Sequence, residues 1–261
     1  MSADTILADF DDPDGSGFPG AGRLRAGAGP RTCPATFTVN FHGIGTAPRA
    51  YDPGEEPFWL TEREFEASLD AVQCEAAGRR VSLTFDDGNV SDHAIAAPAL
   101  VRRGLAAGFF IVAGRLGQAG FVSKAQVRDL ATAGFEIGSH GFDHVDWTRM
   151  SDRELEHEVK DSKTVLEDVI GAAVRRAGIP FGRYDRRVLR ALRAAGYAEV
   201  LSSDGGPRLT AAWPVPRRSM RHGITAADLP GLVAAGRGVF NRTRCEGRLR
   251  VKAALSRRHF V

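Results

Sequence analysis

The chain has 261 residues, of which 43% are hydrophobic and 26% are charged, so it is long enough to build one large domain or two small ones with a sizeable core. Its formal net charge of +3 is too small to indicate a nucleic-acid-binding protein. The three cysteines, Cys33, Cys74 and Cys245, are widely spaced and odd in number, which argues against a disulfide framework.

The first residues are acidic and lack the basic and apolar regions of a secretory signal. No run approaches the roughly 18 apolar residues that a membrane-spanning helix needs. We therefore expect a cytoplasmic protein. Residues 1–34 are rich in Gly, Pro and Asp and predict a flexible arm.

From residue 35 onward, short apolar segments alternate with amphipathic ones. Strands are predicted at Ala35–His42, Arg80–Phe85, Gly108–Val112, Phe135–Gly138, Ala173–Ile179 and Ala198–Ser202. Helices are predicted at Thr61–Val72, Ala94–Arg103, Ser123–Thr132, Ser151–Ile170 and Asp185–Ala195, the first and fourth beginning with a capping box. This alternation predicts parallel strands joined by crossover helices, in either a barrel or a doubly wound sheet.

In both folds the chemistry lies at the carboxyl ends of the strands. The predicted strands end at four unusual groups, which are His42, Asp86-Asp87, His140 and Pro180-Phe181. The adjacent carboxylates are costly to place beside a core, so one could bind a metal while the other acts as a base. The alternative is that they only cap the next helix.

His140 and His144 are four residues apart, a spacing that can bring two imidazoles together on a metal. The alternative is a pair of hydrogen-bonded surface histidines. Two histidines and one aspartate would leave coordination positions open for water and substrate, as a catalytic metal requires. The same ligands suit zinc and non-haem iron.

These motifs resemble the polysaccharide deacetylase family, the NodB-homology group of carbohydrate esterases, over roughly residues 36–218. Thr84–Gly88 matches the family's TFDDG motif, and Ser139–His144 resembles its H-S/T-x-x-H motif with Gly141 replacing the hydroxyl residue. Gly108–Phe110 resembles the family's TFF strand, and Ile179–Asp185 resembles its third motif.

The resemblance implies a distorted (β/α) barrel and a metal held by Asp87, His140 and His144. It implies Asp86 as the general base, and a backbone N–H of Phe181, after Pro180, that helps to hold the oxyanion. The metal would be Zn²⁺, with Co²⁺, Ni²⁺ or Fe²⁺ as alternatives.

The sequence departs from the family pattern in two places. Many members carry an arginine two residues before the proline of the third motif, where this chain has Gly178. Many also carry a Leu-x-His near the C-terminus that supplies the general acid. Because Phe41-His42-Gly43 resembles a subgroup with this motif at the front of the chain, we assign His42 as the general acid.

Two further residues are candidates for substrate binding. Asp204 follows another predicted strand and either lies near the site or only forms a turn. Trp147 follows the second motif and either stacks on a sugar ring or packs in the core.

We predict a single deacetylase domain at residues 35–235. The basic residues at 236–261 predict a tail that either contacts an anionic membrane surface or is simply solvated. The domain would remove N-acetyl groups from an amino-sugar-containing glycan or glycoconjugate and release acetate. The alternatives are a deformylase of a lipid-linked or small amino sugar, and a carbohydrate-binding protein without activity. No nucleic-acid partner is expected, and the oligomeric state is left open.

Overall fold

The structure, a computed structural model, describes residues 37–74, 81–207, 213–224 and 226–235, together with 247, 249, 251 and 252. The arm predicted at 1–34 and most of the tail predicted at 236–261 lie outside the described residues, as do Cys33 and Cys245. Within the described ranges, no helix combines the length and the apolar character needed to cross a bilayer.

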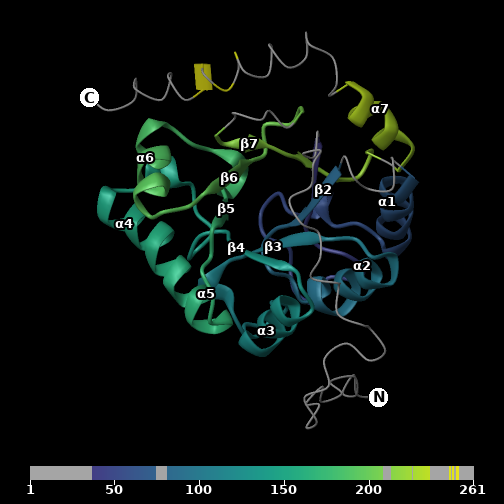
Figure 1. Cartoon of the computed structure of the whole chain (residues 1–261), viewed down its shortest axis with the longest axis horizontal. Coiled ribbons are helices and arrows are strands. Elements are labelled where there is room, and N and C mark those ends of the chain that lie inside the picture. The colour runs from purple at the N-terminus through teal and green to yellow at the C-terminus, as the bar shows by residue number, and fades with distance from the viewer. Residues whose placement is uncertain are drawn as a thin grey trace.

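The described strands form one eight-stranded sheet in the order β7-β6-β5-β4-β3-β2-β1-β8, and every neighbouring pair is parallel. The strands are β1 (Phe37–Phe41), β2 (Val81–Phe85), β3 (Ala107–Ile111), β4 (Glu136–Ser139), β5 (Arg176–Gly178), β6 (Glu199–Ser202), β7 (Val215–Pro216) and β8 (Arg218–Ser219). Figure 1 shows β2 to β7 arranged around a central axis.

The sheet curls into a nearly closed barrel because its two ends are joined by one short stretch of chain, Val215–Ser219. Strand β7 pairs with β6, and β8 pairs with β1, although only Arg217 separates them in sequence. The N–H of Arg217 donates to Ser202, and the N–H of Met220 donates to Asn40 on the opposite edge. The predicted (β/α) barrel is confirmed, and the doubly wound alternative is excluded.

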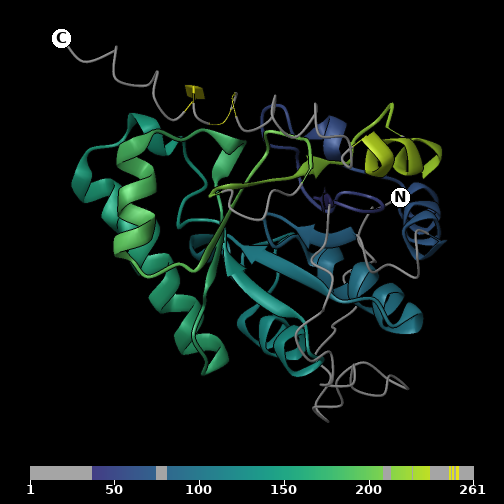
Figure 2. The same cartoon turned by 45° about the horizontal axis from the view of Figure 1, so that its top comes forward.

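The helices cover the outside of the barrel, as Figures 1 and 2 show from two directions. They are α1 (Glu62–Cys74), α2 (Ala97–Arg103), α3 (Lys124–Thr132), α4 (Asp152–Glu156), α5 (Ser162–Ile170), α6 (Arg186–Ala194) and α7 (Leu229–Ala235). The capping boxes predicted at Thr61 and Ser151 are both formed. The predicted helix Ser151–Ile170 is confirmed, with a π-helical turn at His157–Asp161 between α4 and α5.

Alternation along the strands separates an apolar outer layer from a polar interior. Phe41, Phe85 and Phe109 stack in register on neighbouring strands, and Phe65 of α1 contacts the first two edge-on, so this layer faces the helices. The side chains that alternate with these phenylalanines along each strand point into the barrel. The polar side chains at the carboxyl ends of the strands therefore meet inside the barrel.

Candidate functional site

One pocket lies at the carboxyl ends of the strands, with a volume of about 720 Å³. Its walls include four of the residues singled out from the sequence at strand ends, namely His42, Asp86, Asp87 and Phe181, together with His144 and Asp204. Parallel strands bring these residues together because all of their carboxyl ends open on the same side.

Three of these side chains form a cluster that could hold a metal ion. Single ligand atoms of Asp87, His140 and His144 all lie within 4.8 Å of one another. Asp87 Oδ1 lies 3.5 Å from Nε2 of His140 and 3.4 Å from Nε2 of His144. Oδ1 is buried and has no hydrogen-bond partner, so a cation would satisfy a group that is otherwise costly to bury. One carboxylate and two imidazoles fit a divalent transition metal.

Buried His140 is prepared for this role by its other ring nitrogen. Nδ1 lies 2.9 Å from the carbonyl oxygen of Gly178, which can only accept, so Nδ1 carries the proton and Nε2 presents a lone pair. Burial lowers the pKa of His140 to about 4, although Asp86 acts in the opposite direction. The imidazole is therefore neutral near pH 7, as metal binding requires.

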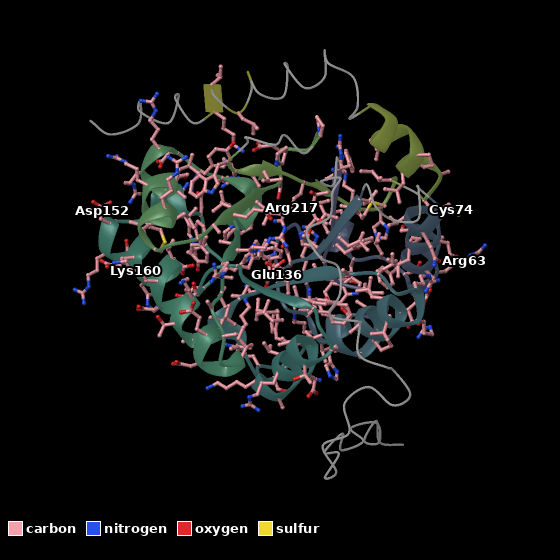
Figure 3. The ribbon with its side chains drawn as sticks, in the orientation of Figure 1. Arg63, Cys74, Glu136, Asp152, Lys160 and Arg217 are labelled. Carbon is pink, nitrogen blue, oxygen red and sulfur yellow. The ribbon has the colours of Figure 1, made fainter. Side chains whose placement is uncertain are left out.

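Asp86 has a partner that the sequence did not reveal. Arg217, which is 0% exposed, donates from Nη1 to Asp86 Oδ1 at 2.7 Å and from Nη2 to Oδ2 at 2.8 Å. Asn40 donates to the same carboxylate at 2.9 Å. Burial acts to raise the pKa of Asp86, but the Arg217 guanidinium, with His140 and His42, outweighs it and lowers the pKa. Figure 3 labels Arg217 near the centre of the barrel, far from the peripheral Arg63.

Arg217 also explains the glycine found where an arginine was expected. A Cβ atom at Gly178 would lie 3.1 Å from Nη2 of Arg217 and 3.0 Å from Nδ1 of His140, so the space beside Asp86 is already filled. Arg176 does not replace the missing arginine, because it pairs with Glu136 and Glu199 at the other ends of the strands. The arginine that pairs with Asp86 thus comes from Val215–Ser219, the stretch of chain that closes the barrel.

Within the described residues, the non-glycine residues with positive φ are Asp87, His144 and Phe181, at 76°, 56° and 55°. All three line the same pocket. Left-handed backbone is strained for residues with a Cβ atom, and such strain gathers at functional sites. This independent observation marks the pocket as the functional site.

Trp147 is buried in the core and does not line the pocket, so the sugar-binding role predicted for it is wrong. Its side chain is 1% exposed, and Nε1 donates to Glu158 Oε2 at 3.1 Å. Glu158, from the π-helical turn, also accepts the backbone N–H groups of Phe142 and Asp143 at 2.9 Å each. Glu158 therefore fixes the loop between His140 and His144, a role that no local sequence pattern signals.

The remaining predicted residues lie at or below the pocket wall. His42 lines the pocket, with its ring 5.0 Å from that of Phe58 and its buried Nδ1 unpartnered. Phe181 is 54% exposed and its ring lies 4.7 Å from that of His144. Pro180 is buried beneath the wall rather than lining it, so it shapes the turn instead of binding substrate as predicted.

Asp204 lines the pocket but is heavily engaged by the protein. It accepts hydrogen bonds from Tyr184 and Ser202 and pairs with Lys252 at 2.6 Å. Lys252 belongs to the predicted basic tail and also donates to the carbonyl oxygen of Gly182. At this point the tail contacts the pocket wall, a position that its composition did not indicate.

Asp92 is a second buried carboxyl that sequence reasoning missed. It lies in a π-helical turn, is fully buried, and has no hydrogen-bond partner on either oxygen. Burial raises its pKa well above the ordinary value, and the charges of Asp87 and Asp86 act in the same direction. Asp92 therefore favours its neutral form more strongly than an ordinary carboxyl group does.

Comparison with known proteins agrees with the motifs and the fold. The family model described as polysaccharide deacetylase matches residues 74–200. YxkH of Bacillus subtilis (strain 168), which its name places among the polysaccharide deacetylases, is 28% identical over 142 residues, or 54% of this chain. The matched region spans about half (51%) of that relative.

Several solved structures share the barrel. The deacetylase PplD of Streptococcus pyogenes, in complex with acetate, has a TM-score of 0.67 at 19% identity, covering 77% of this chain and 99% of that one. IcaB from Ammonifex degensii has a TM-score of 0.60 at 18% identity, covering 77% and 97%. A de-N-acetylase from Aggregatibacter actinomycetemcomitans has a TM-score of 0.62 at 15% identity, covering 75% and 98%.

The fold and the strand-end cluster define a deacetylase-type (β/α) barrel. Residues 74–200 match the polysaccharide deacetylase family, and the family predicted from the motifs is confirmed there.

Proposed function

We propose that this protein is a metal-dependent hydrolase that removes N-acetyl groups from an amino-sugar-containing glycan or glycoconjugate and releases acetate. The observation that carries the proposal is the cluster of Asp87, His140 and His144 beside the ionised Asp86, at a pocket of about 720 Å³ that Asp86, Asp87 and His144 line. Such a pocket is large enough for a sugar residue.

Asp87, His140 and His144 would hold the cation, with Zn²⁺ as the proposed ion and Co²⁺, Ni²⁺ or Fe²⁺ as alternatives. A divalent cation supplies a Lewis acid that polarises a carbonyl group and lowers the pKa of water. Gly178 orients His140 through Nδ1, and Glu158 holds the loop that carries His144.

Asp86 is proposed as the general base. Its carboxylate is ionised and held between Arg217 and Asn40 on the pocket wall, so it can accept a proton from the attacking water without rotating away. His42 is proposed as the general acid that gives a proton to the leaving amine as the amide C–N bond breaks. The backbone at Phe181 is proposed to donate to the developing oxyanion.

The test is release of acetate from N-acetylglucosamine oligomers by protein freed of metal and then reloaded with zinc. We expect release only after reloading, and a loss of at least about 100-fold in kcat for Asp86→Asn. Asp70→Asn, which changes an exposed carboxylate on α1, is the matched control and should keep full activity. His42→Ala should also lower kcat.

Other outcomes separate the alternatives. Formate release from an N-formyl sugar, without acetate release from the acetylated one, would favour the deformylase. Binding of metal and sugar with no turnover of either substrate would favour a carbohydrate-binding protein. A protein that binds no divalent metal would contradict the catalytic proposal altogether.

A further inference from the structure

The charged residues on the pocket wall are mostly neutralised in pairs. Asp52 pairs with Arg115 at 2.7 Å, and Glu55 accepts from Arg49 at 2.8 Å. The other paired acids on the wall are Asp86, with Arg217, and Asp204, with Lys252. Each of these charges is satisfied within the protein, so none of them requires a charged ligand.

Two arginines on the same wall have no acidic partner among the described residues. Arg218 and Arg221 line the pocket, and neither is paired with an acid in the described part of the chain. Nε of Arg218 is buried and has no hydrogen-bond partner. A buried donor without an acceptor is energetically costly, so this guanidinium is arranged to be completed by a ligand.

The position of Arg218 is set by the backbone around it. It is the first residue of β8 and lies in register with Val39 of β1, the strand that ends at Phe41 directly before His42. A Cβ atom on Gly205 would lie 3.4 Å from Arg218 Cζ, so the absence of a side chain there lets the guanidinium pack against the loop after β6. Both the strand and the loop thus hold it at the pocket.

We propose that the substrate carries an oxyanion group, a phosphate or a carboxylate, close to the acetylated amino sugar, and that Arg218 binds it with help from Arg221. The identity of the substrate as an acetylated amino sugar rests on the proposed function, whereas the anion-binding role of Arg218 does not. A planar guanidinium binds either group with two parallel hydrogen bonds, which is stronger and more directional than a neutral contact. Arg221, exposed at the rim, would add attraction at longer range.

The experiment compares three substrates with the zinc-loaded full chain: methyl N-acetylglucosaminide, N-acetylglucosamine 1-phosphate and N-acetylmuramic acid. We expect at least one anionic substrate to have a kcat/KM about tenfold higher than that of the neutral one. Comparison of the phosphate-bearing substrate with the carboxylate-bearing one then identifies which group the site prefers. The ratio of anionic to neutral kcat/KM should fall to near 1 in Arg218→Gln and be partly retained in Arg218→Lys. Arg190→Gln, on the exposed face of α6, is the control and should keep the wild-type ratio.

A second readout does not depend on catalysis. Calorimetric titration with glucose 1-phosphate and with lactate, which lack an acetamide, should show binding of at least one of them that weakens about tenfold in Arg218→Gln but not in Arg190→Gln. If this binding is found while no substrate is deacetylated, the anion site stands and the proposed function fails. If the neutral sugar is deacetylated, with no anionic preference and no effect of Arg218→Gln, the anion site is refuted and the proposed function stands.

Discussion

Replacing Arg217 by methionine tests whether the barrel interior depends on the ion pair with Asp86. Methionine keeps much of the volume of the side chain but removes its charge and its bonds to Asp86 and Asn40, at 2.7, 2.8 and 3.0 Å. Asp86 would become a buried, uncompensated carboxylate. Breaking a buried pair in this way costs about 3–5 kcal/mol, so we expect Arg217→Met to lower the free energy of unfolding by that amount at pH 7.

The assay is urea denaturation in the presence of a chelator, so that metal binding does not contribute to stability. The double variant Asp86→Asn with Arg217→Met should cost at least about 2 kcal/mol less than the sum of the two single variants, because it leaves no unpaired charge. Arg102→Met, which breaks an exposed pair with Glu66 on the outer surface, is the control and should cost at most about 1 kcal/mol.

The pH dependence gives a further check. In the wild-type protein the pKa of Asp86 is lowered, so its contribution is present above the ordinary pKa of about 4 and is lost as the pH falls below it. Without Arg217, burial would raise this pKa, and the variant would lose stability as the pH rises. The stability gap between the two proteins should therefore narrow on acidification through pH 4. A cost below about 1 kcal/mol at pH 7, or a gap independent of pH, would refute the reasoning.

Asp92→Asn should raise the free energy of unfolding by on the order of 1 kcal/mol at pH 7. The reason is that the raised pKa of Asp92 makes the wild-type protein lose stability as the pH rises above about 4, so the gain should vanish below pH 4. If urea denaturation shows no gain at pH 7, this prediction is contradicted. Glu158→Gln should weaken zinc binding about tenfold in a chelator competition, since glutamine cannot accept both loop N–H groups, whereas the exposed Glu156→Gln should not. Gly178→Ala should lower zinc affinity by crowding His140, and unchanged affinity would show that the ring can shift. Zinc should raise the Tm of the wild-type protein, and dialysis against EDTA should reverse the increase.

The strand-end residues could be predicted from the sequence because the pattern that marks them involves only residues that are neighbours in the chain. Apolar segments followed at once by His42, Asp86 or His140 mark strand ends, and parallel strands present those ends on one side. The capping boxes at Thr61 and Ser151 depend only on residues three apart, and both formed. Their prediction required no knowledge of which strands are neighbours.

Arg217 and Trp147 show why the rest could not be predicted. Arg217 is 131 residues from Asp86 and lies in a stretch of two very short strands, one ending in proline, so nothing in its neighbourhood marks it as an interior residue. Trp147 has the composition of a sugar-stacking residue, and only its burial against Glu158 decides otherwise.

Local sequence patterns were enough to predict the alternation of strands and helices, the family, and the residues that gather at the strand ends. The folded barrel was needed to learn which arginine neutralises Asp86, what holds the histidine loop, and which charges on the pocket wall lack a partner among the described residues. This division arises because hydrophobic periodicity and capping act between near neighbours in the chain. Charge pairing and burial depend instead on contacts made when the barrel closes, and Val215–Ser219 makes those contacts by joining the two ends of the sheet.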